Sequence, residues 1–119
     1  MSLQYTPMAY ICAMLIVEST VFTRLITELM SDDEYASFQE VLVNRPEMGD
    51  LIPGGGGLRK VRWRLEGRGK SGGVRIIYYW VTRDNQLRML YVYPKNKQAN
   101  LTKQQLAILR EIVERWANG

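Results

Sequence analysis

The chain has 119 residues, of which 46% are hydrophobic and 24% are charged, values that are typical of one globular domain with a modest core. It contains no histidine and a single cysteine, Cys12, which excludes an intramolecular disulfide framework and a cysteine-rich metal site. Acid–base chemistry in this protein therefore has to use Lys, Arg, Tyr, Asp or Glu side chains.

The net charge of +4 is divided unevenly along the sequence. Residues 58–97 hold eleven of the sixteen Lys and Arg residues but only two of the twelve acids. Basic residues gathered on one part of a small protein indicate a polyanionic ligand, most often a nucleic acid. Strand-like alternation runs through this segment, which excludes a disordered basic tail.

The first residues differ in character from the rest. Residues 9–17 are almost all apolar, but this run is too short to span a bilayer, and no basic residue precedes it as in a secretory signal. We expect residues 1–13 to be an extension of doubtful origin and residues 14–119 to form a single domain. The expected protein is cytoplasmic and has no membrane partner.

The first half of this domain is predicted to contain one strand and two helices. Residues 14–17 are aliphatic and partly β-branched, as in a strand. A hydroxyl residue then caps a first helix, which has apolar residues at helical spacing. A capping box begins a second helix, and Pro46 and Gly49 mark its end. The residues that carry these signals are Ser19 or Thr20, Phe22, Leu25, Ile26 and Leu29 in the first helix, and Ser31 and Glu34 in the second.

Four consecutive glycines follow Pro53. Because such a run is costly to hold in a helix or a strand, we expect a flexible hinge between the acidic half and the basic half. The composition is also similar to that of a phosphate-binding loop, but no Gly-Lys-Ser/Thr follows, and this excludes a P-loop.

The basic half alternates as strands do. Three strands are predicted at residues 58–65, 74–81 and 87–93, and the second is apolar on both faces except for Arg75, which favours a central position. A Thr-x-x-Gln capping box then begins a last helix, whose apolar stripe should lie on the sheet. The predicted fold is α+β, with an antiparallel sheet made of the N-terminal strand and this meander. An N-terminal αα-hairpin and a C-terminal helix accompany the sheet, and the cations are expected on the sheet face opposite to the helices.

Cations on these strands form the candidate site. Lys60, Arg62 and Arg64 form a row with a spacing of about 7 Å, close to the spacing of phosphates along a nucleic acid strand. An ordinary solvated strand face also carries such residues, but the absence of interspersed acids favours phosphate binding. Arg75 stands in an apolar strand and requires an anion, which we expect to be a phosphate rather than a distant carboxylate such as Asp50.

The end of the third strand adds Tyr93, Lys95 and Lys97 to these candidates. Strand ends beside a sheet face commonly present functional groups. The alternative is that Tyr93 is a core aromatic residue and that the two lysines are ordinary loop charges.

Several spaced motifs are combined in this chain: GLRKVR at residues 57–62, GKSGGVRIIYY at 69–79, YVYPKN at 91–96 and LT at 101–102, with VES at 17–19 and SDDEY at 31–35. Together they resemble the RelE/HigB toxin superfamily, and its HigB-like branch most closely. The resemblance implies a small RNase-like fold and the toxin of a toxin–antitoxin system, which cuts messenger RNA on the ribosome. It also implies a cognate antitoxin partner with a helix-turn-helix.

The resemblance and the charge pattern together select the site residues. The candidate catalytic residues are Lys60, Arg75, Lys95 and Tyr93, and the candidate RNA-binding residues are Arg59, Arg62, Arg64, Arg68, Lys70 and Lys97. Relatives often place a tyrosine or a histidine near the C-terminal end of the site, and Tyr93 takes that place in a chain without histidine.

The expected reaction is attack by the 2′-hydroxyl of RNA on the adjacent phosphate, with no metal and no small-molecule cofactor. Lys60 would take the proton if the neighbouring arginines lower its pKa, and Arg75 would stabilise the phosphorane. Lys95 or Tyr93 would protonate the leaving oxygen. The residues do not settle which group is the base and which is the acid.

The alternative function is a non-catalytic basic domain of phage or mobile-element origin that binds RNA or the ribosome. A third possibility is a degenerate relative that keeps only the fold and the contact with the antitoxin. A DNA-binding regulator is disfavoured, because the cations lie on strands and not on a helix. The sequence leaves open the codon preference, the oligomeric state and the identity of the antitoxin.

Overall fold

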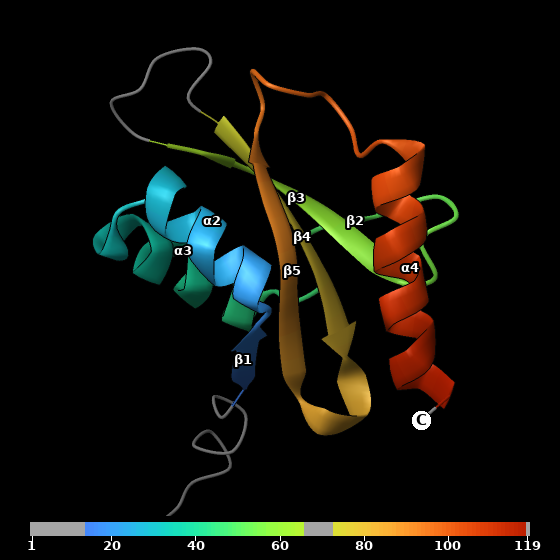
Figure 1. Ribbon diagram of the computed structural model, residues 1–119. Coiled ribbons are helices and arrows are strands. Elements are labelled where there is room, and N and C mark those ends of the chain that lie inside the picture. Colours follow the sequence, from blue (N-terminus) through green and yellow to red (C-terminus); the bar gives the residue numbers. More distant parts are fainter. Residues whose placement is uncertain (1–13, 66–72, 119) are drawn as a thin grey trace, which may run out of the picture.

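The computed structural model describes residues 14–65 and 73–118, which contain three α-helices and five strands (Figure 1). In chain order they are β1 (Leu15–Glu18), α2 (Thr20–Leu29), α3 (Asp32–Asn44), β2 (Asp50–Leu51), β3 (Leu58–Arg64), β4 (Gly73–Val81), β5 (Gln86–Pro94) and α4 (Lys103–Asn118). A 3₁₀ turn, Thr82–Asp84, connects β4 to β5. None of the helices in this part of the chain is both long and apolar enough to cross a membrane.

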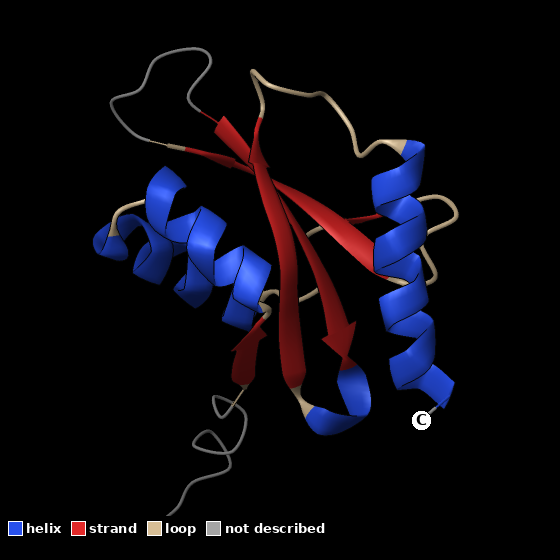
Figure 2. Ribbon diagram, viewed as in Figure 1, coloured by secondary structure: helices blue, strands red, loops and turns tan. Residues whose placement is uncertain are grey.

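The strands form one sheet with the order β1-β5-β4-β3-β2, so the apolar strand β4 is central, as predicted (Figure 2). The meander of β3, β4 and β5 is antiparallel, which confirms the expected hairpins, and β2 extends it in the same way. β1 instead pairs with β5 in parallel, so the sheet is mixed. The long stretch of chain between β1 and β5 supplies the crossover that a parallel pair requires.

The two N-terminal helices begin at the predicted caps. The hydroxyl of Ser19 accepts a hydrogen bond from the N–H of Phe22 at 3.0 Å. Ser31 and Glu34 form the predicted capping box, with bonds of 3.1 Å to the Ser31 hydroxyl and 2.9 Å to the Glu34 carboxylate. These caps fix where each helix starts and therefore how the αα-hairpin crosses the sheet.

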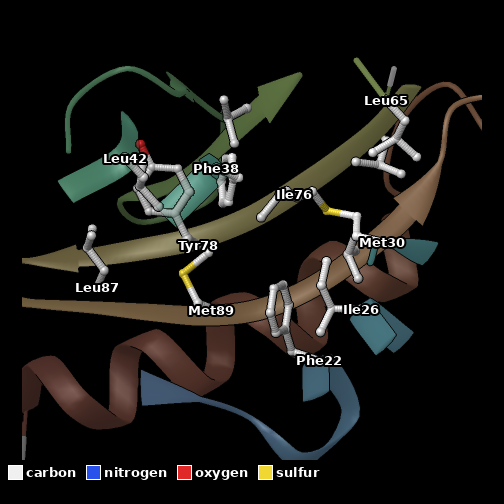
Figure 3. Close-up of a cluster of buried hydrophobic side chains, with 13 residues drawn as sticks. Phe22, Ile26, Met30, Phe38, Leu42, Leu65, Ile76, Tyr78, Leu87 and Met89 are labelled. Atoms are coloured by element: carbon white, nitrogen blue, oxygen red, sulfur yellow. The ribbon is translucent and has the colours of Figure 1, made fainter. Parts of the chain in front are cut away.

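Helices α2 and α3 cover one face of the sheet, and Figure 3 shows the hydrophobic cluster that they bury. Phe22 and Ile26 from α2 and Phe38 and Leu42 from α3 are almost completely buried there. The ring of Phe38 lies 5.0 Å from that of Trp63 on β3, edge to face. Each fully buried side chain of this kind contributes roughly 1.5–3 kcal/mol, so this cluster is a main source of stability.

Helix α4 packs on the other face, where Leu58 and Ile77 are fully buried against it. Its predicted capping box is present, with bonds of 3.0 Å and 2.9 Å between Thr102 and Gln105. Helices therefore lie on both sides of the sheet (Figure 1). The expectation that the cations have the opposite face to themselves is wrong, because Lys60 and its neighbours continue the face that α4 covers.

The glycine-rich segment is an ordered hairpin turn and not the predicted hinge. β2 and β3 pair through Asp50 and Lys60, and the N–H of Ile52 closes the turn by donating to the carbonyl oxygen of Leu58 at 2.9 Å. Gly57 has φ 113°, and a Cβ atom there would lie 2.7 Å from the ring of Tyr79. The glycines therefore allow a tight turn against the sheet, and this turn creates the short strand β2.

Candidate functional site

Two arginines and a tyrosine are aligned across three neighbouring strands. Arg62 on β3 lies opposite Arg75 on β4, and Arg75 lies opposite Tyr93 on β5. Residues that are directly opposite in antiparallel strands have Cβ atoms about 4.5–5.5 Å apart. The structure therefore brings together three candidate residues that are far apart in the sequence.

A cavity of about 290 Å³, here called the basic cavity, opens beside this row. Its lining residues are Arg62, Trp63, Arg64, Gly73, Arg75 and Lys95. The N–H of Lys95 donates to the carbonyl oxygen of Gly73 at 2.9 Å, which joins the end of β5 to the start of β4. The ends of β3, β4 and β5 that carry these residues meet at the top of the sheet in Figure 1.

The cations of the basic cavity have few partners in the protein. Arg62, Arg64 and Lys95 make no side-chain hydrogen bond or ion pair with any residue that the structure describes. Arg75 makes one long contact, from Nη1 to the carbonyl oxygen of Val74 at 3.4 Å. Because like charges opposite each other destabilise a sheet, a bound anion would stabilise this arrangement.

The alternative partner of Arg75, Asp50, lies elsewhere. Asp50 is on the edge strand β2, opposite Lys60, whereas Arg75 is opposite Arg62. No ion pair joins Asp50 to Arg75, two residues that are both described. The structural pair considered as an alternative is therefore absent, and the guanidinium of Arg75 is available to a ligand.

Lys60 lies next to the basic cavity and not within it. It is on the same face as Arg62, about 7 Å earlier along β3. Its Nζ donates to Oδ1 of Asn100, in the loop before α4, at 2.9 Å. Lys60 borders a second cavity of about 340 Å³, which shares Arg62 with the basic cavity.

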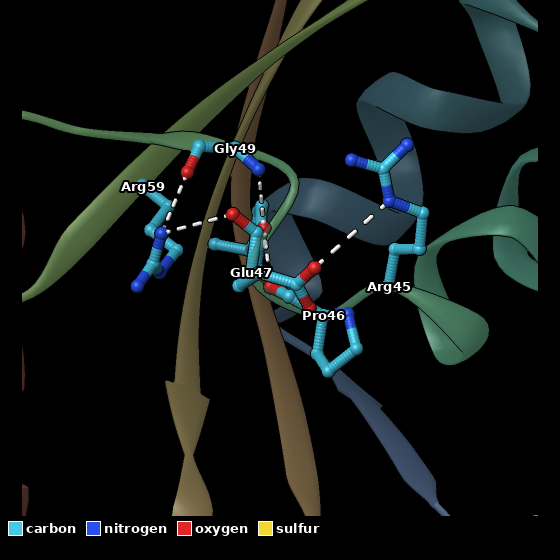
Figure 4. Close-up of polar contacts among 6 residues, drawn as sticks. Arg45, Pro46, Glu47, Gly49 and Arg59 are labelled. Carbon is cyan, nitrogen blue, oxygen red and sulfur yellow. Dashed lines mark hydrogen bonds and ion pairs between the residues drawn. The ribbon is translucent and has the colours of Figure 1, made fainter.

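Arg59, a predicted RNA-binding residue, lies on the other face of β3 and has a structural role (Figure 4). Its Nη1 donates to the carbonyl oxygens of Glu47 at 3.1 Å and Gly49 at 2.7 Å. These bonds attach β3 to the loop that follows α3. Arg59 therefore does not belong to the basic cavity, and it is not one of the cations that surround Lys60.

Tyr93 is 2% exposed and belongs to the cluster under α4, so it lies below the surface beside Arg75. Its hydroxyl has no hydrogen-bond partner among the described residues. Burial raises the pKa of Tyr93, and the guanidinium of Arg75 partly opposes this effect. The phenol of Tyr93 therefore holds its proton more firmly than a free tyrosine does.

The remaining candidates are dispersed. Arg68 and Lys70 lie outside the described residues. Lys97 is exposed in the turn after β5 and borders neither cavity. Asn100 borders the second cavity, but sequence reasoning gives no signal for it, because its contact with Lys60 spans 40 residues.

Comparison with known proteins gives a family and a fold. The family model of the RelE toxin of the RelE/RelB toxin–antitoxin system matches residues 19–118. The chain is similar to a chain of the intact E. coli RelBE toxin–antitoxin complex, with 13% identity and a TM-score of 0.54 over 69% of this chain and 96% of that one. It is also similar to the isolated E. coli RelE toxin, with 16% identity and a TM-score of 0.50 over 87% of this chain and 98% of that one. At these identities the likeness is one of fold.

Proposed function

This chain belongs to the RelE toxin family, and we propose that it is a metal-independent endoribonuclease that cuts messenger RNA on the ribosome and so halts translation. The observation that supports the proposal is the basic cavity, in which Arg62, Arg75 and Lys95 meet without acidic partners among the described residues. Such a cavity suits an RNA phosphate in its charge. The proposed location is the cytoplasm, where ribosomes meet messenger RNA.

Arg62 and Arg75 are proposed to hold the phosphate that is cleaved. A guanidinium donates two parallel N–H bonds to phosphate oxygens, and two opposed arginines bind a phosphate from two sides. Negative charge builds up on the phosphate as the 2′-hydroxyl attacks, so fixed guanidinium groups stabilise the phosphorane more than the starting RNA. The sheet fixes the backbone positions of both arginines opposite each other, so the two side chains begin close together.

The two lysines are proposed to transfer the protons. Lys60, beside Arg62 on the same face, takes the proton of the 2′-hydroxyl, and Lys95, in the basic cavity with Arg75, protonates the 5′ leaving oxygen. Tyr93 is the alternative donor. Because its hydroxyl is buried, RNA would have to gain access to it before such a transfer.

Arg64 and Lys97, with Arg68 and Lys70, are proposed to bind the RNA backbone on either side of the cleaved linkage. Backbone contacts of this kind position the strand without reading its sequence. A site without histidine has modest general-base power at neutral pH. We therefore expect weak cleavage of naked RNA and strong cleavage where the ribosome holds the message in line for attack.

The proposed partner is a cognate antitoxin with a helix-turn-helix domain, as in the HigB-like branch. One solved structure similar to this chain is an intact toxin–antitoxin complex, and that protein is described together with its antitoxin. A short helix-turn-helix reading frame beside the gene for this chain would support the partner. Co-expression of its product should then relieve the toxicity.

Growth arrest after induced expression tests the proposed function. Arg75→Ala and Lys60→Ala should each relieve the arrest and leave messages whole, with an unchanged circular dichroism spectrum. Arg83→Ala is the matched control, because Arg83 is an exposed cation at the other end of β4. Full toxicity of both site variants would contradict the proposed site.

A non-catalytic domain that binds RNA or the ribosome is the alternative function. The absence of histidine and the burial of the Tyr93 hydroxyl favour it. Mapping of message ends after induction separates the two functions. A nuclease produces new ends within translated codons, whereas a binding domain stops translation and leaves the transcripts whole.

A further inference from the structure

The second cavity, here called the Asp50 cavity, differs in chemistry from the basic cavity beside it. Its walls are largely apolar and come from the β2–β3 hairpin, from Leu101 in the loop before α4 and from Leu106 in the first turns of α4. Its polar residues are Asp50, Lys60, Arg62 and Asn100. An apolar hollow with a few polar groups, in the range of about 300–1,000 Å³, is the usual form of a small-ligand site.

The side-chain amide of Asn100 has a defined orientation. In the structure Nζ of Lys60 donates to Oδ1 of Asn100 at 2.9 Å, so Oδ1 is the end of the amide that faces Lys60. Nδ2 of Asn100 makes no hydrogen bond with the residues that the structure describes. A ligand in the Asp50 cavity therefore meets an N–H donor from Asn100.

Asp50 provides acceptors in the same cavity. It lies opposite Lys60 on the edge strand, and its carboxylate has no hydrogen bond or ion pair with the described part of the chain. A carboxylate next to a phosphate-binding surface repels the phosphate and weakens that surface. Its presence there is explained if the ligand brings N–H donors of its own.

We propose that the Asp50 cavity binds a guanine base of the RNA, an inference that rests on the nuclease function proposed above. On one edge guanine donates from N1 and N2 in parallel and accepts at O6. The two donors match the two oxygens of Asp50, in the same way as an arginine fork matches a carboxylate, and O6 matches Nδ2 of Asn100. The phosphate attached to this nucleotide reaches Arg62, which both cavities share.

The other three bases fit this set of groups less well. Adenine and cytosine present one amino group beside an acceptor nitrogen, and that nitrogen would face a carboxylate oxygen of Asp50. Uracil presents one N–H between two carbonyl oxygens. Because a bidentate pair discriminates between bases by about 1–3 kcal/mol, guanine should be preferred by about tenfold or more.

Binding of the four ribonucleoside 3′,5′-bisphosphates to the full chain tests the inference without ribosomes or cleavage. An NMR titration gives each affinity and follows the side-chain amide signal of Asn100. We expect the guanosine compound to bind about tenfold more tightly than the other three and to shift that signal. Equal affinities for the four compounds, or no binding of any, would overturn the inference.

Two variants remove the same charge at different places. Asp50 is exposed on the edge strand, and Asp84 is exposed in the turn between β4 and β5. Asp50→Asn should abolish the preference for guanosine while the affinities for the other compounds stay equal or rise, because a repulsive charge is removed. Asp84→Asn should keep the preference. A preference that survives Asp50→Asn would overturn the inference.

Failure of this inference is distinguishable from failure of the nuclease function. If the chain prefers the guanosine compound but leaves messages whole, the inference about the base site stands and the proposed nuclease function fails. If the chain cuts messages but binds the four compounds equally, the proposed nuclease function stands and the inference about the base site fails. Arg75→Ala should weaken the binding of all four compounds by a similar factor, since it acts on the phosphate.

Discussion

Arg59 and Arg62 lie three positions apart on β3, on opposite faces of the sheet, and their surroundings differ. Arg59 donates to two carbonyl oxygens, those of Glu47 at 3.1 Å and Gly49 at 2.7 Å. Arg62 has no such partner among the described residues and lies opposite another arginine, Arg75. Arg59, on the face under α2 and α3, is therefore satisfied within the protein, whereas the basic cavity leaves its cations to solvent or to a ligand.

Two buried tyrosines differ in the same way. The hydroxyl of Tyr78 accepts from the N–H of Gly49 at 2.9 Å and donates to the carbonyl oxygen of Pro46 at 2.6 Å. The hydroxyl of Tyr93 has no partner in the described part of the chain. Buried polar groups without partners reduce stability. The unpaired hydroxyl of Tyr93 beside Arg75 therefore reduces stability at the edge of the basic cavity.

Tyr78→Phe should have the largest effect on stability. The change leaves the N–H of Gly49 and the carbonyl of Pro46 unpaired, at about 1–3 kcal/mol for each group that stays buried. Urea denaturation should show this loss in the free energy of unfolding. Tyr93→Phe is the matched control, because it breaks no hydrogen bond and should leave the stability unchanged or slightly higher. Equal losses in the two variants would remove the distinction between the two faces.

Arg59→Met should have the next largest effect on stability. It removes two hydrogen bonds between β3 and the loop after α3, at about 1 kcal/mol each, and keeps much of the aliphatic volume. Thermal unfolding should shift to a lower temperature. Growth arrest by the folded variant should persist, because Arg59 does not border the basic cavity. A variant that is stable but no longer toxic would place Arg59 in the site after all.

Tyr35→Phe tests the polar contacts of the α2–α3 face through their pH dependence. The hydroxyl of Tyr35 donates to Glu18 at 2.6 Å, and burial, followed by the Glu18 carboxylate, raises the pKa of Tyr35. The unfolded chain then ionises first, so this contribution to stability is complete below about pH 10 and is lost as the pH rises further.

The free energy of unfolding of the wild-type chain should therefore fall above about pH 10. In Tyr35→Phe the slope of this fall against pH should be smaller, by the amount that corresponds to the release of about one proton on unfolding. At neutral pH the variant should lose about 1 kcal/mol, the contribution of one hydrogen bond. Urea denaturation at a series of pH values measures both effects. Identical slopes in the two proteins would show that the Tyr35 hydroxyl does not keep its raised pKa.

Sequence reasoning succeeded for the elements whose signals are local. The partners in the capping boxes, such as Ser31 and Glu34, are three residues apart, so the spacing alone predicts the bonds that the structure contains. The two-sided apolar pattern of β4 required a central strand whatever its neighbours were. Alternation along β3 also placed Lys60, Arg62 and Arg64 on one face.

The features that sequence reasoning missed depend on distant partners. The parallel direction of β1 is set by its pairing with β5, about 70 positions later in the chain. The Lys60–Asn100 bond spans 40 residues and has no local pattern. The loop carbonyls that bind Arg59 are backbone groups, which every residue carries, so composition gave no reason to separate Arg59 from the RNA-binding arginines.

Arg62→Met should have the smallest effect on stability. The change in the free energy of unfolding should have the opposite sign to the change in Arg59→Met. Arg62 has no described partner to lose, and its removal relieves the repulsion from Arg75 across the strand pair, which is worth about 0.2–1 kcal/mol. Urea denaturation should therefore show an unchanged or slightly higher free energy of unfolding, while growth arrest is lost. The same substitution, three positions apart, would then reduce stability at one site and function at the other. A clear loss of stability in Arg62→Met would mean that this arginine supports the fold, and the basic cavity would lose its clearest sign of a binding role.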